Sequence, residues 1–128
     1  MSKLTKTTIM KAKIERKHQT MDATKVPLGR LATQVSLSLM GKRKVNYAPH
    51  LDLGDYVTVV NGKDIVLTGQ KSLGKVYHHY TGYPGGIRSI KAGALKEKNP
   101  ARLIKLAVKR MLPKNSLGAK MLTRLMIK

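Results

Sequence analysis

The chain has 128 residues, the length of one ordinary domain, and 41% of them are hydrophobic, which is enough to form a folded core. Its 26 Lys and Arg residues stand against only six Asp and Glu, so the formal charge is +20 and a compact domain would need an anionic partner such as a nucleic acid. The absence of cysteine excludes disulfides and Cys-ligated zinc, and no apolar run is long enough to cross a membrane.

The N-terminal region is polar and basic. We expect residues 1–17 to form a basic arm and residues 18–128 to form a single α/β domain that includes basic C-terminal helices, because no linker or internal repeat is visible. The composition of the arm alone would also fit an organellar transit peptide, and this alternative stays open. A short strand is expected near residues 18–23.

The segment between Pro27 and Gly41 has the pattern of an amphipathic helix, since proline suits a first helical position and glycine suits the residue after a helix. Its apolar face consists of Leu28, Leu31, Ala32, Val35 and Leu39. Off this face lie Arg30, Gln34 and Ser38. The helix is followed by Lys42, Arg43 and Lys44. These cations are favourable near the carbonyl end of the helix and are candidates for phosphate contact.

Three further strands are expected. Residues 56–60 form the clearest one, and their β-branched run predicts burial on both faces, as in a parallel sheet covered by helices. Residues 65–68 and 75–80 are predicted as two more strands, separated by a Gly-rich turn at residues 69–74. A loop rich in Gly and Pro follows from Gly82.

The C-terminal third is the most basic part of the chain. Asn99 and Pro100 form a cap and first turn for a helix that ends near Leu112. One face of this helix is apolar, and a second face carries Lys98, Arg102, Lys105 and Lys109. A last segment repeats the pattern, with Leu117, Met121 and Leu125 on one side and Lys120, Arg124 and Lys128 on the other. Such rows of cations cannot pair with acids that the chain does not possess, so they predict contact with RNA or DNA.

Aromatic and histidine side chains at residues 77–80 and at Tyr83 could stack on unpaired bases. On a strand, however, Tyr77 and His79 would face one way and His78 and Tyr80 the other, so one of these pairs is expected to pack inside. The same alternation argues against adjacent histidines acting together as metal ligands.

Patterns typical of enzymes fail on inspection. The residues at 69–72 lack the spacing of a phosphate-binding loop, and Asp52 and Asp55, on either side of Gly54, have the pattern of turn caps rather than of a catalytic pair. We therefore expect no catalytic residue, no metal, no cofactor, no small-molecule substrate and no membrane partner.

Several motifs resemble one known family, the universal large-subunit ribosomal protein thirteen family in its bacterial type. They are MDAT at 21–24, LGRLA at 28–32, GKRK at 41–44, YAPHLDLGDYV at 47–57, TGQK at 68–71, TGYPGG at 81–86 and MLPK at 111–114. The resemblance implies a three-layer α/β/α domain on a small, largely parallel sheet, with a basic N-terminal arm and C-terminal helices. It also implies a structural, non-enzymatic constituent of the large ribosomal subunit that binds large-subunit ribosomal RNA and supports assembly beside neighbouring large-subunit ribosomal proteins. The implied location is the cytoplasm, and an organellar ribosome is less expected.

By these motifs the candidate RNA-binding residues are Arg30, Lys42, Arg43, Lys44, Tyr47, His50, Lys71, Tyr83, Lys109, Arg110 and Lys114. The sequence departs from the family pattern at His18, Tyr80 and Arg110, and the short C-terminal tail common in members is not carried over. Two other functions remain as alternatives: a free nucleic-acid-binding regulator, and an enzyme of nucleotide metabolism, which would need a pocket that the sequence does not indicate.

Overall fold

Three parallel strands and the helices behind them organise the molecule, which we analysed as a computed structural model that describes residues 14–128. Most of the predicted basic arm therefore lies outside the described residues, and its boundary stays a prediction. In chain order the elements are β1 (His18–Asp22), α1 (Leu28–Met40), β2 (Tyr56–Val60), a 3₁₀ turn (Gly62–Asp64), α2 (Lys71–Gly74), β3 (Val76–Tyr80), β4 (Ile87–Lys91), α3 (Ala92–Lys98), α4 (Pro100–Met111), α5 (Ser116–Thr123) and β5 (Leu125–Ile127). The predicted α/β class with a small, largely parallel sheet and C-terminal helices is confirmed.

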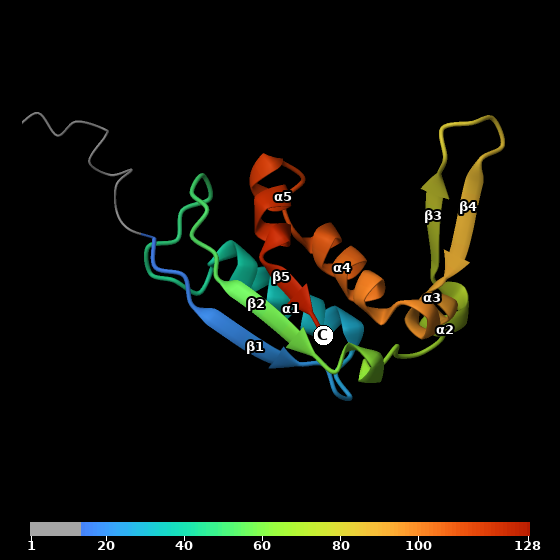
Figure 1. Ribbon diagram of the computed structural model, residues 1–128, viewed down its shortest axis with the longest axis horizontal. Helices are drawn as coiled ribbons and strands as arrows, with labels where there is room; N and C mark the ends of the chain where they lie inside the picture. Colours follow the sequence, from blue (N-terminus) through green and yellow to red (C-terminus); the bar gives the residue numbers. More distant parts are fainter. Residues whose placement is uncertain (1–13) are drawn as a thin grey trace, which may run out of the picture.

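The sheet has the order β1-β2-β5, with both pairs parallel and β2 in the centre. Val57 and Val59 of β2 are fully buried against the helices, whereas Tyr56 on the alternate face is 39% exposed. Burial of this strand on both faces is therefore a wrong prediction. Helix α1 lies behind the sheet in Figure 1 with α4 packed against it, and within residues 14–128 no helix covers the front.

Helix α1 follows the sequence pattern closely. The predicted apolar face is buried, and Gly41 ends the helix with a φ of +73°, a left-handed conformation that glycine adopts without strain. Pro27 precedes the first turn in an extended conformation. Ser38, which lies off the predicted apolar face, is nevertheless buried: it is 2% exposed, and its hydroxyl donates to Oε1 of Gln19 at 2.9 Å, because β1 passes beside the end of α1.

The middle of the chain forms a hairpin that the sequence only half predicted. The strand expected at 75–80 is confirmed as β3, but it pairs antiparallel with β4, for which the sequence predicted no element. The strand predicted at 65–68 is wrong, since only Val66 forms an isolated bridge, to Pro27. The hairpin projects from the body of the molecule in Figure 1, and only its base is packed.

The C-terminal elements close the core. Helix α4 begins as predicted, with the Asn99 side chain accepting a hydrogen bond from the Arg102 N–H at 3.0 Å. Its Leu103, Ile104 and Val108 are fully buried in the hydrophobic core, where α4 packs mainly against α1 and α3. The apolar pattern of the last segment continues into Leu125, but the helix itself stops at Thr123 because the next residues pair with β2. No helix in the described part of the chain has the length and apolar character needed to span a membrane.

Candidate nucleic-acid interface

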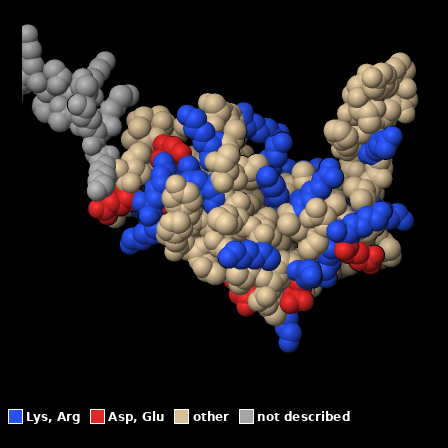
Figure 2. Space-filling model, in the orientation of Figure 1, with Lys and Arg blue, Asp and Glu red and all other residues tan. Residues whose placement is uncertain are grey.

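Lys and Arg side chains are spread over the face of the body that Figure 2 shows, and they outnumber the acidic ones there. The predicted row is exposed throughout, with Lys98 at the end of α3 and Arg102, Lys105 and Lys109 on α4. Among residues 14–128 the ion pairs involve only two carboxylates, Asp52 and Asp55, so none of the cations on this row has an acidic partner there. A row of unpaired cations is the surface that a phosphate backbone neutralises.

The predicted site residues do not gather at one place. One group follows α1 and consists of Lys42, Arg43, Lys44, Tyr47 and His50. A second group includes Lys71 and Arg110, which line one cavity. Lys109 precedes Arg110 in the sequence, and Lys114 lies just beyond α4. Arg30 lies in the first turn of α1, and Tyr83 lies in the hairpin turn. All of these side chains are exposed except Lys44 and Tyr47, which are half-buried.

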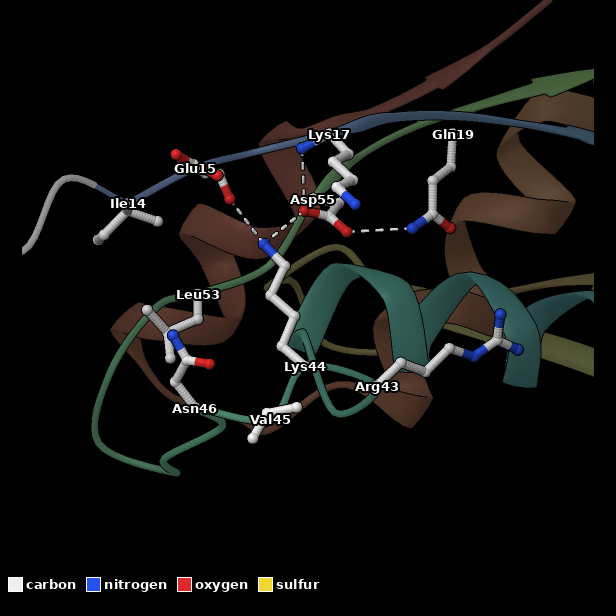
Figure 3. A pocket seen from close by; sticks show the side chains of 10 residues that line it. All are labelled: Ile14, Glu15, Lys17, Gln19, Arg43, Lys44, Val45, Asn46, Leu53 and Asp55. Carbon is white, nitrogen blue, oxygen red and sulfur yellow. Dashed lines mark hydrogen bonds and ion pairs between the residues drawn. The ribbon is translucent and has the colours of Figure 1, made fainter.

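Lys44 is held inside the protein by its own neighbours (Figure 3). Its ammonium lies 2.6 Å from Oδ1 of Asp55 and donates to the carbonyl of Glu15 at 2.8 Å. The same carboxylate accepts from the Lys17 N–H and the Gln19 amide, each at 3.0 Å. Burial alone would raise the pKa of Asp55, but the Lys44 contact and these hydrogen bonds outweigh it and lower the pKa below its usual value.

Arg43, Lys44 and Asp55 line one open pocket, which has a volume of about 500 Å³. Within the described residues Arg43 forms no hydrogen bond or ion pair, in contrast to its neighbour Lys44. The run of three cations after α1 therefore divides into one side chain that is paired within the protein and two that are exposed.

Asp52 forms the second internal ion pair. The Arg124 guanidinium binds it through two hydrogen bonds of 2.6 Å and also donates to the carbonyl of Leu39 at 3.2 Å. Arg16 reaches the same carboxylate at 3.5 Å. Partial burial would raise the pKa of Asp52, but the bonds and charge of Arg124, with the charge of Arg16, lower it.

Two expectations are corrected by this pair. Arg124 does not lie on an exposed basic face, because only 8% of it is exposed. Asp52 and Asp55 are not simple turn caps either, since each one anchors a cation from a distant part of the chain. Their engagement leaves no free carboxylate pair at this place, and residues 14–128 hold no group of three His, Cys, Asp or Glu suited to a metal ion.

Tyr77 is the one aromatic residue of the hairpin that packs inside. It is 6% exposed, while His78, His79 and Tyr80 are exposed, so packing of a complete pair is a wrong prediction. Two cations lie over the Tyr77 ring, with Nζ of Lys75 at 5.5 Å and Cζ of Arg110 at 4.9 Å from the centroid. Farther out, residues 78–87 carry no Lys, Arg, Asp or Glu.

Sequence reasoning missed Lys75 and the internal role of Arg124. Lys75 stands four residues after Lys71, a spacing that could have marked the two as neighbours. Arg124 carries no comparable signal, because its partner Asp52 lies 72 residues away in the sequence.

The family described as "Ribosomal protein L13" matches residues 16–127, which is most of the chain. The chain belongs to this family. A protein of Thermotoga maritima is 56% identical over 123 residues, covering 95% of this chain and 83% of the relative. A protein of Legionella pneumophila is 50% identical over 107 residues, with 84% and 74% covered, and one of Pediococcus pentosaceus is 50% identical over 112 residues, with 88% and 76% covered.

These relatives are each named "Large ribosomal subunit protein uL13". The resemblance drawn from the motifs is confirmed by the family match. As a member of the ribosomal protein L13 family, the chain is a structural protein of the ribosome and not an enzyme, as the sequence predicted.

Proposed function

We propose that this chain is a component of the large ribosomal subunit, where it binds large-subunit ribosomal RNA, contacts neighbouring ribosomal proteins and supports assembly of the subunit. The relatives of known name are large-subunit proteins from bacteria, and the cytoplasmic ribosome is accordingly the proposed location.

The observation that carries the RNA-binding proposal is the row of exposed cations at the end of α3 and along α4. Lys98 ends α3, and Arg102, Lys105 and Lys109 lie on α4. None of the four has a carboxylate partner among residues 14–128. Bringing phosphates to this row would release counterions from the RNA, which is the main source of affinity for such a surface.

The proposed contacts extend beyond α4 to the other exposed candidates. These are Arg30, Lys42, Arg43, His50, Lys71, Tyr83, Arg110 and Lys114. Lys44 and Tyr47 contribute less to binding in this proposal, because Lys44 is paired with Asp55 and Tyr47 is half-buried.

The test is titration of ribosomal RNA with the full chain at several salt concentrations. Contact with six or more phosphates gives a log–log slope of about −4 or steeper. The variant Lys105→Ala/Lys109→Ala should weaken binding and flatten the slope, whereas the matched control Lys63→Ala/Lys91→Ala removes the same charge from exposed positions elsewhere. A nearly flat slope for the unmodified chain would contradict RNA binding.

Sedimentation tests the ribosomal location. The chain should travel with large subunits at moderate salt, and subunits formed without it should accumulate as incomplete particles. Recovery of the chain away from ribosomes and bound to other RNA would instead support the alternative of a free nucleic-acid-binding regulator.

A further inference from the structure

Three cations from separate segments line one cavity on the side of the molecule where α1 begins and α4 ends. Lys71 comes from α2, Lys75 from the residue after α2, and Arg110 from the last turn of α4. The cavity has a volume of about 170 Å³, and Leu28 and Gly29 of α1 complete this part of its wall.

The charges of these three side chains are not balanced within the described residues. The ammonium of Lys71 donates to the hydroxyl of Thr68 at 3.1 Å, and Lys75 and Arg110 both lie over the ring of Tyr77. No Asp or Glu of residues 14–128 is within ion-pair distance of any of the three. Like charges held around one cavity repel each other, so an anion placed between them is attracted by all three.

The first turn of α1 adds a second source of positive potential. This 13-residue helix has no side-chain cap at its start and no acid in its first turn. The N–H of Leu28 is used by the carbonyl of Val66, whereas the N–H of Gly29 has no acceptor among the described residues. An uncapped helix start offers free N–H donors and the positive end of the helix dipole to an anion.

We propose that this cavity binds one phosphate group of the RNA backbone, held by Lys71, Lys75 and Arg110 at the start of α1. The proposal rests on the proposed RNA-binding function and assigns a specific ligand group to part of it. The planar guanidinium of Arg110 suits two oxygens of one phosphate, and the two lysines add charge without fixing geometry. The shared chemistry is a tetrahedral phosphate, so free inorganic phosphate is the alternative occupant that the experiment must separate.

The first arm measures RNA binding by the full chain against salt. Because one phosphate is shared by both lysines, Lys71→Gln/Lys75→Gln should reduce the slope by about 0.9 and no more. Its matched control, Lys63→Gln/Lys91→Gln, should leave the slope and affinity closer to those of the unmodified chain. Arg110→Lys keeps the charge but removes the planar guanidinium that binds two phosphate oxygens. The salt slope should therefore stay the same, while the dissociation constant for RNA rises by about tenfold, which equals about 1.4 kcal/mol. Thermal melting checks that each variant is folded. If Lys71→Gln/Lys75→Gln does not fold, the RNA affinity of Arg110→Lys decides whether the cavity binds a phosphate.

The second arm follows the backbone amide of Gly29 by nuclear magnetic resonance during titration with RNA and, separately, with inorganic phosphate. A shift with RNA that is lost in the glutamine variant supports the proposal. Saturable binding of inorganic phosphate combined with unchanged RNA affinity in the variants would overturn it in favour of a free-anion site. Variants that behave like the control would also overturn it, while failure of the unmodified chain to bind RNA at all would refute the underlying function as well.

Discussion

Replacing Asp52 with Asn should destabilise the fold strongly, because it breaks the ion pair with Arg124. The carboxylate receives two hydrogen bonds of 2.6 Å from Arg124, whose side chain is 8% exposed and also contacts the backbone of α1. Removing one partner of a buried pair costs about 3–5 kcal/mol, because the remaining charge is left without compensation. The Asp52 side chain keeps 16% exposure, so we expect about 3 kcal/mol, the lower end of that range.

The assay is a double-mutant cycle followed by thermal and urea unfolding of the full chain. For a domain of this size, about 3 kcal/mol corresponds to a fall in Tm of roughly 12 °C. Arg124→Met alone should be similarly harmful, because it leaves Asp52 without its main cation. The double variant should be milder than the sum of the two, with a coupling energy of about 2 kcal/mol.

The pH dependence gives an independent check on the same pair. The pKa of Asp52 is lowered in the folded state, so its contribution is fully present above its unfolded pKa of about 3.9 and is lost as the pH falls below that value. The stability gap between the unmodified chain and Asp52→Asn should therefore shrink in acid. Single variants that each cost less than about 0.5 kcal/mol at neutral pH would refute the reasoning, since that is the behaviour of an ordinary surface pair.

Three other outcomes follow from the packing. Leu39→Ala should cost about 2–5 kcal/mol in unfolding experiments, because the side chain is fully buried, and any loss of RNA binding should match the unfolded fraction. Lys44→Ala should cost about 1–3 kcal/mol by leaving Asp55 without its cation, whereas Lys42→Ala should stay within about 0.5 kcal/mol; equal melting temperatures would contradict this division. Gly54→Ala should cost about 3 kcal/mol or more in the same melts, because the added Cβ would collide with the backbone carbonyl of Leu39.

Local signals predicted the regular elements where one pattern dominated. The spacing of apolar residues and Gly41 defined α1, and Asn99 with Pro100 defined the start of α4, because these features act within one or two turns of the chain. β4 was missed because its sequence, IRSIK, shows little apolar alternation. It forms a strand because it pairs with β3, and its own sequence does not indicate that pairing.

The long-range contacts could not be predicted in the same way. Arg124 and Asp52 are far apart in the sequence, and nothing in the basic pattern around Arg124 separates a buried cation from an exposed one. The candidate cations were named one by one from motifs, and the meeting of Lys71 with Arg110 at one cavity depends on how α2 and α4 pack. The sequence thus identified several of the cations that line the cavity but not which of them are neighbours in the fold.

The projecting β3–β4 hairpin has a consequence for how the molecule fluctuates. Tyr77 anchors its base, whereas Tyr80, Tyr83 and Ile87 are more than 60% exposed and contribute nothing to the core. An isolated two-stranded ribbon is only marginally stable in water. Its outer amides should therefore exchange with solvent through local opening, at a free energy far below that of unfolding β2. The distal hairpin can thus adapt its conformation to a contacting surface while the sheet and helices stay intact.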